Sequence, residues 1–391
     1  MSQDSVKLPS IRGRLSPEAF AERLVQKLTG LAPDLEMRLV EGMTLRIVGP
    51  RSEQRVHLDR AFEQYQKKPE NIEEILGRWC ASLVAIGADV ATVSLEAVVP
   101  IVKGRRWIDL QRAHHIEQFG DDSAFGLCWE RYNTELIVVY AEFKEGLRYL
   151  RAADVGENAL DWSTLRAQSI ANLRRRTQEL RFLGGGDKAI VISGEGNLEP
   201  SLILLEELWD DPRLRVAGNR LVTIAARGFA LTCGADNPWH IWQLAADAAE
   251  SYRKAQYPVS PHLFEQRANR FEVVDFGEAD ANHPIPSTDN LDFHAIKKGG
   301  GSDLGLIIVS PLQADARSVY RLFQKLDNYL QFIAGDAYRQ ECGTPSPQST
   351  SIKVSVHPKT DPAVLALLGG LGDWVKARNA GLVVDKTGFT E

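Results

Sequence analysis

Residues 35–48, with the sequence LEMRLVEGMTLRIV, alternate apolar and polar side chains on both sides of a turn at Glu41-Gly42. An alternation of period two is typical of a strand with one buried face, and a tight turn that contains glycine joins two such strands antiparallel. The stretch therefore predicts a hairpin with strands at 35–40 and 43–48.

Two helices are predicted after this hairpin. Asp59 marks the start of a short helix that runs to about Lys67, and Pro69 opens the next helix, where its missing N–H costs little. Large apolar side chains recur in the second helix at helical spacings, which places them on one face, and we expect this face to lie against a core. These side chains are Ile72, Ile75, Leu76, Trp79, Leu83 and Ile86.

The order of two strands and a helix recurs along the chain. The predicted strands and helices are 136–141, 146–150 and 162–182, then 221–225, 229–233 and 239–252, and finally 291–296, 304–309 and 315–333. These units are unevenly spaced and share no residue motif, which argues against a solenoid of fixed period. They predict an α+β protein in which recurring strand-strand-helix units form mixed or antiparallel sheets with helices packed on them.

Both ends of the chain extend this pattern. Ser16-Pro17-Glu18 is typical of a helix start, and Gly30 predicts the end of that helix. The C-terminal end is predicted to form a compact ββαβα module. It comprises the fourth unit, a loop at 343–351, a strand at 352–356, a helix at 361–378 and a short strand at 382–384.

Composition divides the chain into four parts. Residues 275–290, DFGEADANHPIPSTDN, are rich in Pro, Asp, Asn and Ser without periodicity, as linkers are. We therefore predict a leader and helix at 1–34, an α+β region at 35–274, this linker, and a smaller C-terminal α+β module at 291–391. A further break inside the second part, near 120–130, is an open alternative.

Overall composition and charge indicate an ordinary globular protein. Of its 391 residues, 44% are hydrophobic and 25% are charged. No apolar run approaches the roughly 20 residues of a membrane span, and no signal-peptide core is present, so we predict a cytoplasmic protein without a membrane partner.

The net charge of −6 argues against nucleic acid as the main partner, because binding to phosphates needs a basic surface. Of the short basic runs, Arg174-Arg175-Arg176 predicts a helix end, and 103–107 (KGRRW) predicts a solvated turn between strands.

The residues that commonly bind metals are scattered. The four cysteines form no Cys-x-x-Cys pair, which indicates free, buried thiols; they are Cys80, Cys128, Cys233 and Cys342. His114 and His115 are adjacent, so their side chains diverge in either a helix or a strand and do not favour one shared ion. The sequence predicts no metal and no cofactor.

The turn at 187–199 is the first place to look for chemistry. A predicted strand leads into the sequence SGEGNLEP, and a helix follows; an anion can bind to free amides at such a turn. Gly194 and Gly196 are therefore the candidate cofactor-binding residues. Glu199 stands in place of the third glycine and Glu195 adds negative charge, which favours a capped turn over an anion site. No pattern identifies catalytic residues.

Three stretches carry a resemblance to a known family: the Leu-Arg-Ile core within 43–48, the helix RAQSIANLR at 166–174, and the run 221–274. Through them, residues 35–274 resemble the YtpQ-like family of uncharacterised bacterial proteins, a domain of unknown function. The resemblance implies a bacterial, cytoplasmic α+β protein and supplies no catalytic residues. The C-terminal module is additional to the family pattern and resembles small stand-alone bacterial proteins of unknown role.

Two functions from different classes are left. The first is a non-catalytic factor, of the inhibitor or immunity type, that binds another protein through a strand edge or an apolar patch. Strand-rich units favour it, and so does the acidic charge, which suits basic targets such as nucleases. The second is an enzyme whose site is assembled from dispersed polar residues around Asp187 and the 187–199 turn. We favour the first and expect the partner to be another protein.

Overall fold

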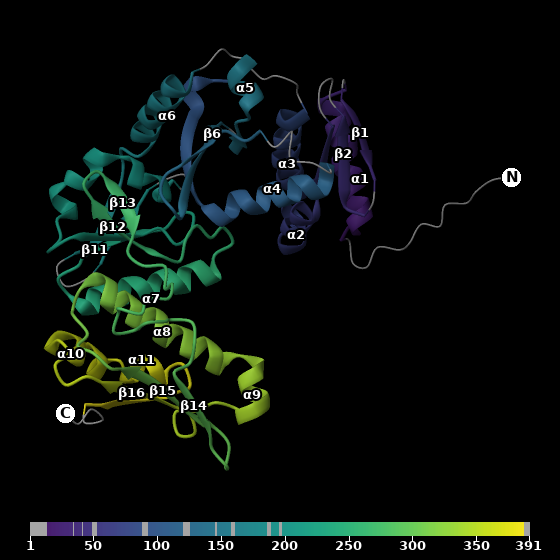
Figure 1. Cartoon of the computed structure of the whole chain (residues 1–391). Coiled ribbons are helices and arrows are strands. Elements are labelled where there is room, and N and C mark those ends of the chain that lie inside the picture. Colours follow the sequence, from purple (N-terminus) through teal and green to yellow (C-terminus); the bar gives the residue numbers. More distant parts are fainter. Residues whose placement is uncertain are drawn as a thin grey trace. The chain divides into compact units, whose positions relative to one another are not determined.

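A computed structural model describes the chain at residues 14–33, 35–40, 42–48, 53–87, 93–119, 126–144, 147–157, 161–185, 189–194 and 198–386 (Figure 1). It is an α+β protein with helices packed on antiparallel and mixed sheets, which confirms the predicted fold class. No helix in the described part of the chain combines the length and apolarity needed to cross a membrane.

The chain forms two compact units. Unit 1 contains residues 1–99, 126–128 and 140–169, and unit 2 contains 100–125, 129–139 and 170–391. Two strands, β4 (Val98–Gly104) and β6 (Leu136–Phe143), have residues in both units. They belong to a sheet of order β4-β6-β5, in which β5 is Trp129–Arg131 and β7 (Leu147–Tyr149) also pairs with β6.

Unit 1 opens with a helix and a three-stranded antiparallel sheet of order β1-β2-β3. These elements are α1 (Pro17–Leu31), β1 (Glu36–Leu39), β2 (Thr44–Val48) and β3 (Glu53–His57). The helix start is confirmed, because the Ser16 side chain accepts a hydrogen bond of 3.2 Å from the Ala19 N–H. The helix continues to Leu31, one residue past the predicted end at Gly30. The hairpin is also confirmed, whereas the sequence did not predict β3, in which Val56 is the lone aliphatic residue.

A helical pair closes the core of this sheet. Helix α2 (Asp59–Lys67) begins after Leu58 without a side-chain cap, so Asp59 is its first residue and not its cap. A 3-10 turn, η1 (Pro69–Asn71), then leads into α3 (Ile72–Gly87). Of the predicted apolar face, Ile75, Leu76 and Leu83 are buried and Ile72 and Trp79 pack at the margin of the core. The side chain of Ile86 lies outside the described residues.

The remaining elements of unit 1 lead into unit 2. They are η2 (Leu95–Ala97), α5 (Ala152–Glu157) and α6 (Trp162–Arg176), whose last residues belong to unit 2. The predicted helix at 162–182 is therefore too long. Residues 181–184 form a strand instead, because they pair in register with the next strand, and tertiary pairing overrides local helix propensity. Gly184 has φ of +100°, and a Cβ there would lie 2.4 Å from the Ala189 carbonyl oxygen, so only glycine fits.

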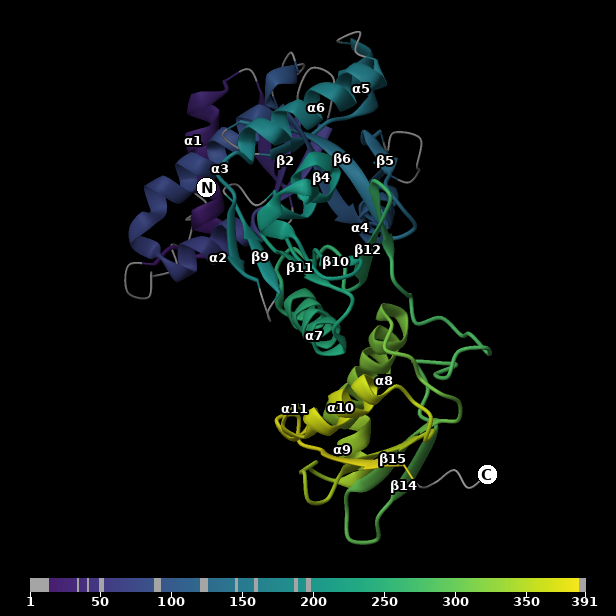
Figure 2. The ribbon, with the colours of Figure 1, turned by 90° about the vertical axis from the view of Figure 1, so that its left-hand side faces the viewer.

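Unit 2 contains a six-stranded antiparallel sheet of order β13-β12-β10-β11-β9-β8, with α7 along one face (Figure 2). Its strands are β8 (Arg181–Gly184), β9 (Ile190–Ser193), β10 (Arg220–Thr223), β11 (Ala230–Gly234), β12 (Leu263–Arg267) and β13 (Arg270–Val273), and α7 is Pro238–Lys254. Short 3-10 helices and α4 complete this part: η3 (Glu199–Leu204), η4 (Glu206–Asp210), η5 (Pro212–Leu214) and α4 (Arg105–Phe119). The third predicted strand-strand-helix unit is thus confirmed by β10, β11 and α7.

The C-terminal module is a four-stranded mixed sheet of order β14-β15-β16-β17 with helices on one face. Its strands are β14 (Phe293–Ile296), β15 (Ser302–Ile308), β16 (Ser351–Val356) and β17 (Gly381–Asp385). Its helices are α8 (Ala316–Ala334), α9 (Asp336–Cys342), α10 (Pro362–Gly370) and α11 (Gly372–Lys376). Every predicted strand is present. The helix predicted at 361–378 is two helices with Leu371 between them, and α9 was not predicted.

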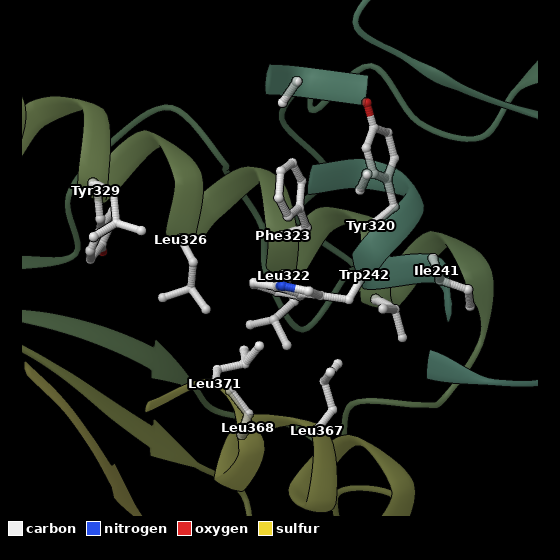
Figure 3. Packing of buried hydrophobic residues seen from close by; sticks show 14 of the residues in the cluster. Ile241, Trp242, Tyr320, Leu322, Phe323, Leu326, Tyr329, Leu367, Leu368 and Leu371 are labelled. Carbon is white, nitrogen blue, oxygen red and sulfur yellow. The ribbon is translucent and has the colours of Figure 1, made fainter. Parts of the chain in front are cut away.

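One hydrophobic core joins this module to the six-stranded sheet. Helices α7 and α8 lie side by side (Figures 1 and 2). The indole of Trp242 on α7 packs edge-to-face on the ring of Phe323 on α8, with 5.2 Å between ring centres (Figure 3). It packs in the same geometry on the indole of Trp374 on α11, at 5.1 Å. The module is therefore packed onto the sheet through α7.

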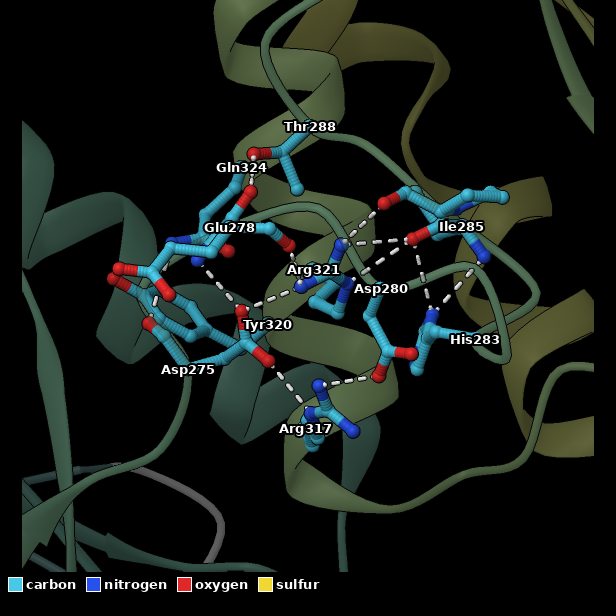
Figure 4. A network of polar contacts seen from close by, with 12 residues as sticks. Asp275, Glu278, Asp280, His283, Ile285, Thr288, Arg317, Tyr320, Arg321 and Gln324 are labelled. Atoms are coloured by element: carbon cyan, nitrogen blue, oxygen red, sulfur yellow. Dashed lines mark hydrogen bonds and ion pairs between the residues drawn. The ribbon is translucent and has the colours of Figure 1, made fainter.

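Residues 275–290, which the sequence predicted to be a linker, form a loop that is hydrogen-bonded to α8. Arg321 on α8, only 1% of whose side chain is exposed, donates to the Asp275 carboxylate at 2.7 Å and to the carbonyl oxygens of Glu278, Ile285 and Pro286 (Figure 4). Lys325, one turn later, donates to carbonyl oxygens at both Ser287 and Asn290 and to the carboxylate of Asp292. The polar composition that indicated a linker instead supplies the acceptors that two buried cations need.

Candidate functional site

Helix α7 covers only part of the face of the six-stranded sheet on which it packs. The rest of this face, toward β9 and β8, is exposed. One cross-strand row runs from Leu263 through Thr223, Leu231 and Val191 to Leu183, each residue directly opposite the next. Exposure along this row is 0%, 0%, 5%, 39% and 59%. Helix α7 packs on β10, β11 and β12, and the apolar face that it leaves open lies on β9 and β8.

A groove of about 890 Å³ runs beside α7 over this open face. Val191, Leu231 and Phe229 form an apolar floor, and the side of α7 forms a wall. The wall residues are Asp247, Glu250, Ser251 and Lys254, whose spacing puts them on one flank of the helix. The groove therefore combines an apolar base with a charged wall, as sites for amphipathic segments do.

The wall of the groove carries a carboxylate that forms no ion pair with any residue the structure describes. Glu250 forms an ion pair with Lys254, one turn further along α7. Asp247 has no cationic partner among the described residues. Its side chain reaches solvent, yet the surrounding protein raises its pKa, and the charge of Glu250 raises it further. A cation from outside the chain would relieve this unfavourable environment.

Two cations, Arg227 and Lys103, lie close enough for the charge of one to affect the other, and Arg227 lines the groove. Arg227, a lining residue, places its guanidinium 5.5 Å from the centre of the Tyr257 ring. Lys103 at the end of β4 is 8% exposed, with Nζ 5.5 Å from the centre of the Trp107 ring. Burial and the charge of Arg227 lower the pKa of Lys103 to about 8. Neither cation forms an ion pair with a carboxylate of the described residues.

This arrangement corrects the expectation for residues 103–107. The sequence predicted a solvated turn between strands, whereas Lys103 and Gly104 end a buried strand and the residues after them start α4. A Cβ on Gly104 would lie 2.1 Å from the Val259 carbonyl oxygen, so the strand end packs tightly against the segment that leads to β12. The apolar run before Lys103 was the signal that could have extended the strand this far.

The 187–199 turn does not offer its described amide to an external anion. The Glu199 carboxylate accepts a hydrogen bond of 3.1 Å from the Gly194 N–H. The helix after it, η3, is a short 3-10 segment in which Glu199 is the first residue. The interpretation as a capped turn therefore fits Gly194, whereas Gly196, Glu195 and Asp187 lie outside the described residues.

The thiols are free and buried. Burial raises the pKa of Cys128 to about 11 and that of Cys233 to about 12, which makes both inert as nucleophiles at neutral pH. The described residues contain no group of three or more His, Cys, Asp and Glu side chains that could hold a metal ion. His114 and His115 lie on α4.

Sequence reasoning missed the groove because exposure within a strand depends on where a distant helix lies. Val191 belongs to a short apolar stretch that looks like any buried strand, and Leu183 follows a stretch that the sequence predicted as helix. The resemblance of residues 35–274 to the YtpQ-like family stays a prediction. No family model, no curated protein and no solved structure matches this chain.

Proposed function

We propose that this chain is a non-catalytic binding factor that holds an amphipathic helix of another protein in the groove beside α7. The observation that carries the proposal is the row from Leu263 to Leu183, in which exposure rises from 0% to 59% away from α7. A helix beside α7 would cover Val191 and Leu183 and continue the layer that α7 begins. A factor of this kind acts by occupying its partner, as an inhibitor or an immunity-type protein does.

The geometry supports a bound helix better than an added strand. The edge strand β8 has four residues, carries Arg181 and ends at Gly184. Shortness and charge are the features by which sheet edges avoid pairing with another chain. The open apolar surface lies on the face of the sheet, where a helix packs.

Charge on the wall indicates the composition of the partner helix. Asp247 has no ion-pair partner among the described residues, so a lysine or arginine on the flank that faces α7 would complement it. The net charge of −6 favours the approach of a basic partner over longer distances. We therefore expect leucine-like residues on one face of the partner helix and basic residues on its flank.

A synthetic peptide tests this proposal directly. The probe is an amphipathic peptide of about 18 residues, five turns of helix, with leucines on one face and lysines on the other. We expect the full-length chain to bind it, with affinity reduced at least about tenfold by Val191→Asp, because a buried unpaired carboxylate opposes docking. Asp247→Asn should weaken binding of the lysine peptide. It should not weaken binding of a matched peptide in which glutamates replace the lysines. Fluorescence anisotropy measures both.

The control is Val383→Asp, which places the same charge at a half-exposed valine on β17, far along the chain. A photo-crosslinking residue at position 183, introduced into the full-length chain in its source cells, supplies the second measurement. The proposal predicts a protein partner cross-linked through a helical segment, with the product lost in Val191→Asp and kept in Val383→Asp. Absence of peptide binding together with no cross-link sensitive to Val191→Asp would overturn it.

A further inference from the structure

A second hollow, of about 380 Å³, lies between α4 and β5 and is separate from the groove beside α7. Its base is formed by Ile108 and Ile137, which are both buried. Its walls carry the side chains of Arg105, Arg112, Arg131 and Trp129. Volumes of roughly 300 to 1,000 Å³ with an apolar base and a few polar groups are typical of sites for small molecules.

Two periodicities bring these side chains together. On β5, Trp129 and Arg131 are two residues apart and share one face, and Arg131 lies directly opposite Ile137 on β6. On α4, Arg105, Ile108, Asp109 and Arg112 follow the spacing of one helical face. The strand and the helix therefore present their basic side chains toward the same space.

The side chains that line this hollow are mainly basic, whereas the chain as a whole is acidic. It is lined by three arginines and one carboxylate, Asp109, in a chain of net charge −6. The half-buried carboxyl group of Glu135 also lies near Arg105: partial burial raises the pKa of Glu135, and the charge of Arg105 opposes this rise. The Arg131 Nε donates to the Asn133 carbonyl oxygen at 3.0 Å, which fixes its guanidinium in place. The excess of guanidinium groups favours an anionic ligand.

We propose that this hollow binds a small molecule in which an oxyanion is attached to a flat ring. Arg105 and Arg131 hold the oxyanion, because the planar guanidinium matches both carboxylates and phosphates with paired hydrogen bonds. The indole of Trp129, 41% exposed, stacks on the ring. A small, partly open hollow in an acidic chain favours a small molecule over a nucleic acid, which needs an extended basic surface.

Calorimetric titration of the full-length chain tests the assignment with three probes: adenosine monophosphate, benzene-1,2-dicarboxylate and inorganic phosphate. Adenosine monophosphate and benzene-1,2-dicarboxylate distinguish binding of a phosphate from binding of a carboxylate. Inorganic phosphate, which has no ring, tests whether the ring is needed. At least one ring-bearing probe should bind, with affinity reduced about tenfold or more in both Arg105→Gln and Arg131→Gln. Trp129→Ala should weaken the ring-bearing probes and leave inorganic phosphate unchanged.

The matched control is Arg106→Gln, which removes the same charge from the neighbouring exposed residue of α4 that does not line the hollow. The affinity of this variant for the ring-bearing probes should stay within about twofold of that of the original chain, since the Arg106 side chain does not line the hollow. Equal losses of probe affinity in Arg106→Gln and Arg105→Gln would overturn the site, because general electrostatic attraction alone would then explain the binding. Absence of binding by both ring-bearing probes would also overturn it, as would tighter binding of single-stranded RNA than of any small probe. Unchanged thermal midpoints of the variants show that folding is not the cause.

Discussion

At the scale of single residues, Lys103 is a side chain whose environment disfavours its charge. It is almost completely buried, it lies near Arg227, and it has no carboxylate partner among the described residues. Buried charges are normally paired, and unpaired ones are concentrated at functional sites. The sequence could not show this, because KGRRW reads as a polar turn until the strand before it is seen to continue into the interior.

The first prediction concerns the dependence of stability on pH. Lys103 titrates near pH 8 in the folded chain and near 10.5 when unfolded, so the unfolded state binds more protons between these values. The free energy of unfolding should therefore rise with pH over this window. Lys103→Met should remove this rise and increase stability at pH 7 by up to about 3 kcal/mol, at about 1.4 kcal/mol per pKa unit.

Urea denaturation of both chains at pH 7, 8, 9 and 10 measures this effect as the difference between them, so that other titrating groups cancel. A Lys103→Met chain that is less stable at pH 7 would show that the ammonium has a favourable partner. The prediction would then be wrong.

At the scale of elements, α8 organises a segment that composition alone assigns to a linker. Arg321 and Lys325 extend from this helix into the 275–290 loop and bind its carbonyl and carboxylate oxygens. A sequence pattern shows that a segment is polar, but not that a buried cation elsewhere uses its acceptors. The strands and helices themselves were predictable where apolar alternation was strong, as in β1, β2 and α7. They were not predictable where pairing overrode propensity, as in β8.

The second prediction tests this anchoring. Arg321→Met leaves the Asp275 carboxylate and several carbonyl groups of the loop without their buried donor, so unfolding of unit 2 should become easier by about 3 kcal/mol or more. Arg317 still pairs with Asp275, which keeps part of the network. The control is Arg339→Met, because the exposed pair of Arg339 with Asp336 should contribute at most about 1 kcal/mol. Urea midpoints measure both, and equal losses would contradict the role assigned to Arg321.

At the scale of the whole molecule, the C-terminal module and the six-stranded sheet share one core. The sequence predicted a boundary at 275–290, yet Trp242 before it packs on Phe323 and Trp374 after it. Side-chain periodicity predicts the buried face of an element without identifying its partner. The floor of the groove was hidden for the same reason, since it depends on which strands α7 leaves bare.

The third prediction follows from this shared core. A chain that ends at Asp275 exposes Trp242 and its neighbours on α7, so it should lose the cooperative thermal transition of the full-length protein and associate through the bare helix. Calorimetry and light scattering measure these two changes. A monomeric shortened chain that melts at the original temperature would show that the sheet folds independently of the module.

The interleaving of the two units has a consequence for inheritance. Because the chain enters unit 2 at residue 100, returns to unit 1 at 126 and again at 140, and leaves it for the last time after residue 169, every single cut divides at least one unit. A single crossover can therefore carry one unit whole only together with segments of the other unit, and only when it falls before residue 100 or after residue 169. A fragment complementation assay should accordingly cut the chain before residue 100 or after residue 169, because any cut between these positions divides both units.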